Sequence, residues 1–513
     1  MKNLKGLLLA VILMLTVNAL MAQTYTETAL MFSRTKPAGS ARILGMGGAQ
    51  ISLGGDISSA YSNPAGLGMY NRSEFSITPG YYQLQNTGSY FVGNSLVSEG
   101  NTDMKSSLSI PAFGLIFSRP KDDEGFIHGT FGVTATRLND FNSNLNYGGT
   151  NNSNSLINYF LNEANGGTPD QFGSGGDLYN TVTELAYDNF LVGEASIIDP
   201  DFPSDEYFTD FDRDINPNVL QEETMQTKGA QNQWSFSYGA NFNDKFFLGA
   251  GLGIVALNFQ SQKVYKETFT NQPINNYSLT EDLQIRGTGI NVTIGAIGRP
   301  IDGLQIGGAV TTPTRYNLTD TYAASMRSNW NNFDYYGDGS EILASEQAAT
   351  DDITSGYTFR TPWKFAAGAS YVFGKSGLIS FDIERLNYGG SKYNSQTTGV
   401  SYEADNDEIS QLYASRTNYR LGGEYRIKSF RVRGGANYMP DPFKDEQNDV
   451  SRSRVSASAG VGYRVSKFYI DLAYIKSWGS NTYRPYTLGN GDSPLLKYDQ
   501  LSSNVVGTIG FTF

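Results

Sequence analysis

The sequence has no cysteine and a single histidine, His128, among its 513 residues. Without cysteine there is no disulfide, no zinc–thiolate site, no thiol nucleophile and no lipid attached to an N-terminal cysteine. One histidine cannot build a cluster of histidine ligands within a single chain. We therefore expect no metal site and no cofactor.

Long apolar runs are also scarce. The mean hydropathy is −0.35, and beyond the N-terminus no run of about 18 apolar residues could form a spanning helix. At the N-terminus, Lys2 and Lys5 precede an apolar core from Gly6 to Val17, and "NALMAQ" offers a cleavage site after Ala22. This pattern predicts a signal peptide over residues 1–22 and an exported mature protein.

Basic residues are the minority among the charged residues. Removing Lys2 and Lys5 from the 38 lysines and arginines leaves 36 against 50 acidic residues, a net charge of −14. An excess of negative charge argues against nucleic acid as a partner.

Aromatic residues and glycine are abundant, and much of the chain alternates with a period of two. In "WSFSYGANF" (234–242), apolar or aromatic residues alternate with small or polar ones, and "FYIDLAYIKSW" (468–478) and "NVVGTIGFTF" (504–513) repeat the pattern. Such alternation predicts strands with one apolar and one polar face.

Fourteen segments of this kind can be placed. They lie near residues 75–82, 106–118, 126–138, 232–242, 246–260, 282–298, 303–316, 357–373, 377–388, 416–427, 430–439, 452–465, 468–478 and 500–513. The connections between them alternate strictly between short turns and long loops. Outer-membrane barrels combine short periplasmic turns with long extracellular loops and an even strand count. The sequence therefore predicts an all-β fold, a 14-stranded antiparallel transmembrane β-barrel over residues 73–513 in the cell outer membrane. A secreted solenoid is the rival architecture, but no fixed repeat period is present.

The longest loop, 139–231, contains two stretches with helical apolar spacing, "SLINYFLNEANG" (155–166) and "DLYNTVTELAYDNFLV" (177–192). They predict short helices over the extracellular mouth. The alternative is a flexible acidic loop with incidental apolar residues.

Residues 23–72 precede the first strand and are rich in glycine. A barrel of fourteen strands is wider than its own side chains can fill, so this segment is expected to plug the lumen as a hatch. Asn63 and Pro64 predict a turn within it. The run "GMGG" matches half of a dinucleotide-binding fingerprint but lacks the strand before it and the helix after it, so we set that interpretation aside.

The segment "ARILGMGGAQISLGGDISSAYSNPAGL" (41–67) resembles the N-terminal hatch of the FadL/TodX family of outer-membrane transport proteins. The matching elements are the "GMGGA" run, the "D-x-S-S-A" step and the "NPAG" turn, and further matches are 361–373, 378–388, 432–442 and 460–476. The resemblance implies a fourteen-stranded barrel, plugged from the periplasmic side, that passes hydrophobic molecules. It also implies that substrate leaves sideways, through a gap in the wall where a strand kinks inward.

Two groups of residues are candidates for a functional site. The candidate gating residues of the hatch are Gly47, Gly48, Asn63, Pro64 and Ala65; alternatively, the Asn-Pro-Ala turn only packs the plug.

The inward face of the predicted wall also carries charge, with Arg420, Arg426, Arg431 and Arg433 near Asp382, Glu384, Glu424 and Asp471. These arginines guide an anionic headgroup, or they form salt bridges that stiffen the wall and anchor the hatch. Arg34, Lys36, Arg42, Arg454 and Arg464 invite the same two interpretations.

His128 is predicted to face the lumen near the periplasmic end of the third strand. A lone histidine can ligate haem iron, but it can equally hydrogen-bond its neighbours. No "GxSxG" context accompanies it, so we expect no enzyme, and no spaced EF-type loop predicts a calcium site.

Three functions follow as hypotheses. The first is passive uptake of long-chain fatty acids or other small hydrophobic compounds, gated by the hatch. The second is a non-transport role that holds secreted proteins at the outer membrane, and the third is haem uptake. Expected partners are the outer-membrane bilayer, the hydrophobic substrate and, because Phe513 ends the chain like a C-terminal barrel signal, the barrel-assembly machinery.

Overall fold

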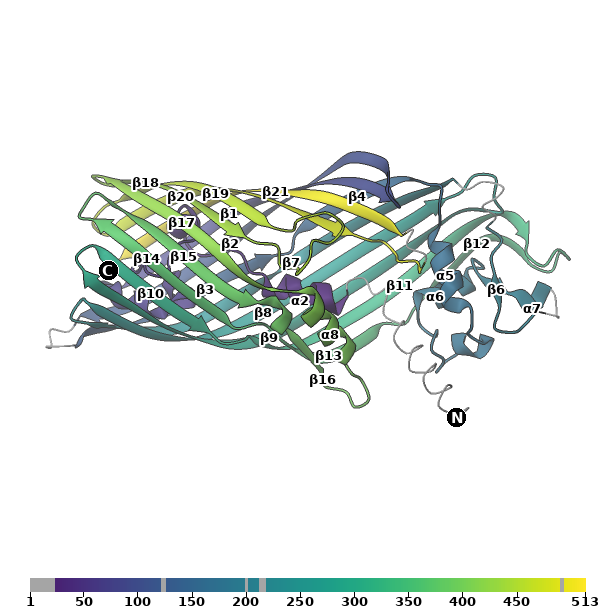
Figure 1. The fold of residues 1–513 in the computed structure, drawn as a ribbon, viewed down its shortest axis with the longest axis horizontal. Helices are drawn as coiled ribbons and strands as arrows, with labels where there is room; N and C mark the ends of the chain where they lie inside the picture. Colours follow the sequence, from purple (N-terminus) through teal and green to yellow (C-terminus); the bar gives the residue numbers. More distant parts are fainter. Residues whose placement is uncertain (1–23, 121–125, 199–201, 212–217, 490–492) are drawn as a thin grey trace.

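Fourteen antiparallel wall strands form a closed barrel (Figure 1). The structure, a computed structural model, describes residues 24–120, 126–198, 202–211, 218–489 and 493–513. The predicted signal peptide lies outside the described residues. The wall strands, some divided into two segments, are β1 (Glu74–Val92), β2 (Ser95–Pro120), β3 with β4 (Phe126–Asp140, Ser143–Asn151), β7 (Val219–Phe242), β8 (Phe246–Thr268), β9 (Ile274–Ile301), β10 with β11 (Leu304–Thr311, Arg315–Asp334), β13 with β14 (Ile353–Arg360, Lys364–Phe373), β15 with β16 (Gly377–Asn387, Lys392–Ser395), β17 (Ser415–Ile427), β18 (Phe430–Met439), β19 (Arg454–Arg464), β20 (Phe468–Tyr483) and β21 (Pro494–Thr512).

The last strand closes the barrel against the first. β21 pairs antiparallel with β1, for example Ile77 with Ile509, so the first and last wall strands leave no free edge where the barrel closes. The predicted 14-stranded barrel is confirmed. Many strands are longer than predicted: β9 has 28 residues, whereas a transmembrane strand needs about 9–11, so it continues beyond the membrane.

The outer face of the barrel is apolar. On β14, which follows Trp363, the outward-facing residues are Phe365, Ala367, Ala369, Tyr371 and Phe373, and the aromatic residues among them are exposed. At about 3.3 Å per residue and a tilt near 40°, this stretch covers the roughly 25 Å apolar belt of an outer-membrane barrel, with aromatic residues at both rims. The protein therefore resides in an outer membrane.

Three neighbouring wall strands are interrupted at the same height. β10 gives way to β11 around Pro313, β13 to β14 around Pro362, and β15 to β16 at the 3₁₀ turn η3 (Tyr388–Gly390). Proline has no N–H to donate to a strand ladder. The first two breaks are adjacent, because the Thr361 nitrogen donates to the Thr314 carbonyl at 3.1 Å.

The N-terminal segment (residues 24–72) lies inside the barrel and touches strands on opposite sides. Its elements are α2 (Tyr25–Ser33), α3 (Ala41–Leu44), α4 (Ser59–Ser62) and η1 (Pro64–Met69). Helix α3 contacts β19, β20 and β21, whereas η1 contacts β7, β8 and β9. Thr24 and Ser40 cap α2 and α3 by accepting from the backbone nitrogens of Glu27 and Ile43, as N-cap residues do.

Helices cover the long-loop end of the barrel, to the right in Figure 1. The predicted helices in the 139–231 loop are confirmed as α5 (Leu156–Ala164) and α6 (Val182–Asp188). The other elements outside the wall are η2 (Pro169–Phe172), β5 (Gly193–Glu194), α7 (Ala195–Ile198), β6 (Tyr207–Phe208), β12 (Ile342–Ala349) and α8 (Glu403–Leu412). Across the described ranges, no helix is long and apolar enough to cross a membrane.

The carboxylate of Glu267 on β8 holds the start of α5. It accepts hydrogen bonds from the Leu156 nitrogen at 2.9 Å, the Ser155 hydroxyl, the Gln221 amide at 2.7 Å and the Tyr277 hydroxyl at 2.9 Å. Glu267 is fully buried. A buried carboxylate is tolerated where donors satisfy it, so this residue ties the loop helix to the wall.

Candidate functional site

Glycines on the inner face of the wall make room for the N-terminal segment. A Cβ atom at Gly239 would lie 2.5 Å from the Pro64 carbonyl oxygen, and one at Gly249 would overlap the Ala65 nitrogen. The same holds on four other wall strands, where a Cβ would meet the N-terminal segment at Gly295, Gly307, Gly422 and Gly435. No side chain fits between wall and segment at these positions, because real Cβ atoms do not approach so closely.

The predicted gating residues lie at two of these contacts. Asn63 is fully buried, and its amide donates to the Ile51 carbonyl at 2.7 Å and, more weakly, to the Ala296 carbonyl of β9 at 3.4 Å. Pro64 and Ala65 begin η1 beside β8. Across the lumen, Gly47 donates to the Ser458 hydroxyl of β19 at 3.0 Å, and Gly47 and Gly48 both have positive φ. The structure thus brings these residues to the wall on opposite sides; their role in gating stays a prediction.

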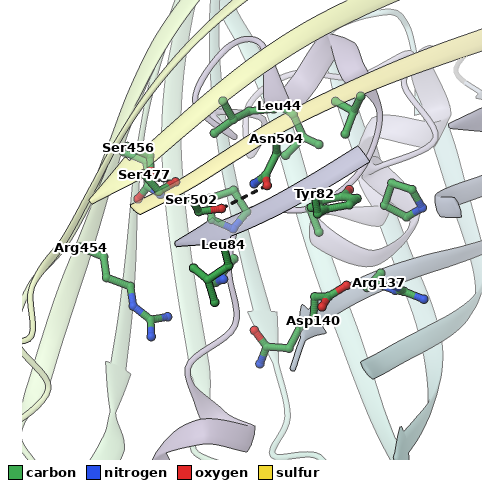
Figure 2. Close-up of a pocket in the computed structure, with 18 of the residues that line it drawn as sticks. Leu44, Tyr82, Leu84, Arg137, Asp140, Arg454, Ser456, Ser477, Ser502 and Asn504 are labelled. Carbon is green, nitrogen blue, oxygen red and sulfur yellow. Dashed lines mark hydrogen bonds and ion pairs between the residues drawn. The ribbon is translucent and has the colours of Figure 1, made fainter. Parts of the chain in front are cut away.

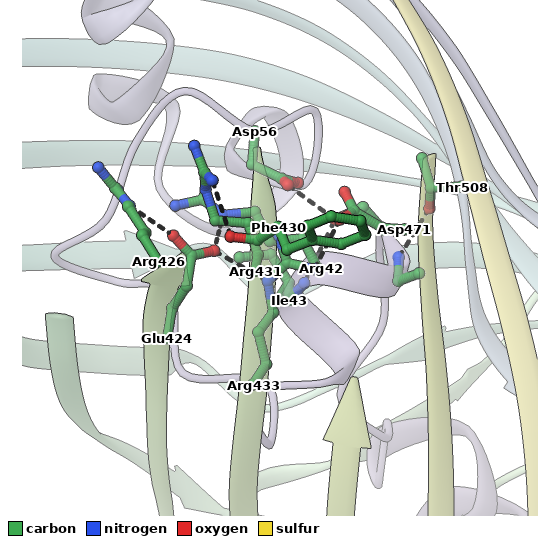
Figure 3. A network of polar contacts seen from close by, with 12 residues as sticks. Arg42, Ile43, Asp56, Glu424, Arg426, Phe430, Arg431, Arg433, Asp471 and Thr508 are labelled. Carbon is green, nitrogen blue, oxygen red and sulfur yellow. Dashed lines mark hydrogen bonds and ion pairs between the residues drawn. The ribbon is translucent and has the colours of Figure 1, made fainter. Parts of the chain in front are cut away.

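A network of ion pairs joins the N-terminal segment to the wall near the periplasmic turns (Figure 3). Glu424 accepts from Arg426 at 2.9 Å and from Arg433 at 2.8 Å, and it faces Arg42 of the N-terminal segment at 3.4 Å. Arg433 also reaches Asp471 at 2.6 Å. Arg433, Glu424 and Asp471 are all buried. Removing one partner of such a buried network costs about 3–5 kcal/mol, because the other charge is left unpaired.

The other two arginines of the predicted group make no ion pair with Glu424 or Asp471, although Arg431 lies directly opposite Arg426 on the neighbouring strand. Arg420 binds Glu384 at 2.7 Å. Arg431 donates to the carbonyls of Lys428 and Phe430 in a periplasmic turn. Three of the four predicted arginines are therefore held in ion pairs within the wall, which favours the anchoring interpretation for them. Headgroup binding by any of the four stays a prediction.

Asp382 is a second anchor of the N-terminal segment. One of its carboxylate oxygens accepts from the backbone nitrogens of Gln50 at 2.5 Å and Ile51 at 2.8 Å. The side chain is fully buried on β15. Hydrogen bonds to a charged group are stronger than neutral ones, so this contact fixes the backbone next to the glycine-rich turns.

A cavity lies between the N-terminal segment and the wall formed by β1, β2, β3 and β18 to β21 (Figure 2). Its empty space is about 1340 Å³, part of which opens to solvent. The inward apolar residues that line it are Leu44, Tyr82, Leu84, Leu138, Met439, Ile475 and Val506. Such a lining suits a small hydrophobic molecule.

The cavity also carries unpaired positive charge. Lys36, Lys105 and Arg454 line it, and none of them makes an ion pair with a residue in the described ranges. Arg137 is satisfied by Asp140 at 3.0 Å. Desolvation by the surrounding protein, together with repulsion from Arg454, lowers the pKa of Lys36 to about 8. At neutral pH the cavity therefore offers an apolar wall beside three free cations.

The wall next to the cavity is not continuous. The β2–β3 ladder ends at Ala112 and Thr136, and beyond it β2 pairs with β1 alone among the described strands. We call the gap between residues 104–111 and 137–142 the seam. At the end of the seam away from the β2–β3 ladder, β2 and β4 are joined through a side chain instead of a backbone ladder. The Asp103 carboxylate of β2 accepts from the Asn146 backbone nitrogen of β4 at 2.6 Å.

His128 lies in the lumen, as its position in the alternation predicts. It is buried, and its Nε2 atom lies 2.5 Å from the Tyr70 carbonyl, to which the ring donates. This contact closes the N-terminal segment against β3 and occupies the Nε2 atom. In the ranges that the structure covers, no group of three or more histidine, aspartate or glutamate residues could hold a metal ion.

Comparison with known proteins defines the class of fold. No protein-family model and no curated protein matches the sequence. Among solved structures, the chain is similar to a Pseudomonas aeruginosa FadL homologue, with a TM-score of 0.55 and 14% identity over 94% of this chain and 99% of that one. The Ralstonia pickettii toluene transporter TbuX gives a weaker match, with a TM-score of 0.48 and 13% identity over 92% and 98%. The chain thus has the fold of FadL-type outer-membrane channels.

Sequence reasoning found the N-terminal segment and the charged wall but missed the wall glycines and the cavity. The glycines could have been found from the sequence. Gly249, Gly295 and Gly307 occupy inward positions of the predicted strands, where glycine stands in place of the polar side chains expected on a lumenal face. The cavity could not, because Tyr82, Arg137 and Arg454 come from strands far apart in the sequence.

Proposed function

We propose that this protein is a passive outer-membrane channel for small hydrophobic compounds, and that its preferred substrates are amphipathic acids such as long-chain fatty acids. The cavity beside the seam carries this proposal. Its apolar lining suits an alkyl chain, and the free cations along it, Lys36, Lys105 and Arg454, suit a carboxylate, since hydrogen bonds to a charged group are stronger than neutral ones.

The geometry supports a sideways path. Lys105 of β2, residues 137–140 of β3 and Asn142 beyond β3 line both the cavity and the seam, so a molecule in the cavity lies next to unpaired wall. An alkyl chain that leaves through the seam enters lipid without crossing water, which avoids the cost of exposing apolar surface. The N-terminal segment gates this path from the lumen side, because Lys36 and Leu44 of that segment form part of the cavity.

The test is binding of oleate and of its neutral methyl ester to the purified full-length protein, by native mass spectrometry and titration. We expect oleate to bind at least about tenfold more tightly than the ester, because only oleate pairs with the cations. In the Lys36→Met/Arg454→Met variant, oleate should bind no better than the ester.

Arg327→Met is the matched control, since Arg327 is an exposed cation on β11 away from the cavity. It should leave both affinities unchanged. Equal binding of acid and ester by the unmodified protein would overturn the choice of acids, and binding of neither would overturn the channel function itself.

A further inference from the structure

Three cations lie side by side on the outer face of the barrel. Arg315 of β11 is paired directly with Arg360 of β13, and Arg360 is paired directly with Lys392 of β16. The residues next to them in sequence, Tyr316 and Phe359, are buried, so the three cations point away from the lumen. Directly opposite residues have Cβ atoms about 5 Å apart, which makes this a continuous row of positive charge.

No acidic residue in the described part of the chain compensates this row. None of the three cations makes an ion pair within the described chain. The next outward positions on the loop side are neutral on all three strands: Asn317, Thr358 and Asn394. Like charges directly opposite each other destabilise a sheet, so the row is unfavourable until an anion lies across it.

The row lies at the upper rim of the apolar belt. Below Arg360 on the same wall strand come Trp363 and Phe365, with exposed fractions of 49% and 53%. The long loops lie on the other side of the row. This depth is that of the lipid headgroups in the outer leaflet, since aromatic residues mark the boundary between hydrocarbon and headgroups.

A groove continues the row toward the membrane. It forms where the strands are interrupted at Pro313 and Pro362, and it has about 770 Å³ of empty space, part of it open to solvent. Arg360, Trp363, Phe365 and Arg385 line it. It therefore offers an aromatic surface for apolar chains and guanidinium groups above them.

We propose that this face binds a phosphorylated glycolipid of the outer leaflet. The row of Arg315, Arg360 and Lys392 binds its phosphate groups, and the groove receives its acyl chains. Guanidinium groups bind phosphate oxygens in pairs, and a phosphate across the row removes the repulsion between its cations. The site lies on the outer wall and is independent of the lumenal cavity.

The test uses the full-length protein in non-ionic detergent with lipid A and with enzymatically dephosphorylated lipid A, followed by native mass spectrometry. We expect lipid A to bind the unmodified protein, and the Arg315→Gln/Arg360→Gln/Lys392→Gln variant to bind it at least about tenfold more weakly. Dephosphorylated lipid A should bind the unmodified protein as weakly as lipid A binds the variant.

Two controls keep the result interpretable. Arg327→Gln removes an exposed cation of β11 outside the row and should bind lipid A like the unmodified protein. Without lipid, the triple variant should melt at the same temperature or higher, because repulsion has been removed. Equal binding of lipid A by the triple variant, or equal binding of the two lipids by the unmodified protein, would overturn the proposal.

Discussion

At the scale of single residues, glycines on the inner face of the wall allow the N-terminal segment to pack directly against the strands. Gly249 has no space for a Cβ, because the backbone of Pro64 and Ala65 occupies that position. Gly249→Val should displace the N-terminal segment and raise the permeability of the outer membrane to large antibiotics. Gly298→Val is the matched control, since a Cβ at Gly298 meets nothing within 4 Å. Equal antibiotic sensitivity of the two variants would show that this contact does not hold the segment.

Lys36 gives the proposed channel a dependence on pH. Its pKa of about 8 lies below the ordinary value of a lysine, so the ammonium group loses its proton as pH rises through 8 while a bound carboxylate stays ionised. Arg34, Arg454 and Asp140 are the charged groups that act on it. Oleate binding should therefore weaken by about tenfold between pH 6.5 and 9.5, the loss of one charge-assisted contact.

The arginine variant provides the control for this pH dependence. Lys36→Arg keeps its charge over the whole range, because arginine stays protonated, and its oleate affinity should be nearly flat. A flat profile for the unmodified protein would place the headgroup elsewhere in the cavity.

At the scale of elements, one carboxylate organises the loop helices. Glu267→Ala would leave the Leu156 nitrogen and the Tyr277 hydroxyl without their common acceptor. Buried donors without a partner cost about 1–3 kcal/mol each, so the amides of α5 should lose hydrogen-exchange protection. Glu222→Ala, at an exposed position on the adjacent strand β7, should leave the exchange of α5 unchanged; similar loss in both variants would contradict the assignment.

The wall strands show which parts of the fold could be predicted from the alternation of apolar and polar residues. Wall strands were predictable where lipid requires an apolar outer face, because alternation is enforced there. Above the membrane that requirement ends, so the predicted segment 303–316 stops where β11 continues to Asp334. The row of Arg315, Arg360 and Lys392 was not predictable either, since it depends on the register between strands, which the sequence of a single strand does not contain.

At the scale of the whole molecule, the seam is the feature that the proposed path requires. An Asp103→Cys/Asn146→Cys pair replaces a contact across the upper end of the seam, and the chain has no cysteine of its own. Oxidation should tie β2 to β4 and lower oleate uptake several-fold in cells, and a reducing agent should restore it.

The cross-link also has a matched control. Leu115 and Val133 face each other where β2 and β3 are fully paired, so the Leu115→Cys/Val133→Cys pair should have no effect on uptake after oxidation. Unchanged uptake with the oxidised pair at the upper end would mean that substrate leaves by another path.

The pairing of β1 with β21 has a consequence for how the molecule is made. Ala41 of the N-terminal segment donates its backbone N–H to the Thr508 hydroxyl in β21 at 2.7 Å. A segment that precedes every described wall strand in the chain is thus bound by the wall strand that follows the other thirteen. The barrel cannot close, and this contact cannot form, until the C-terminal strand has arrived, so the wall is completed around its own contents.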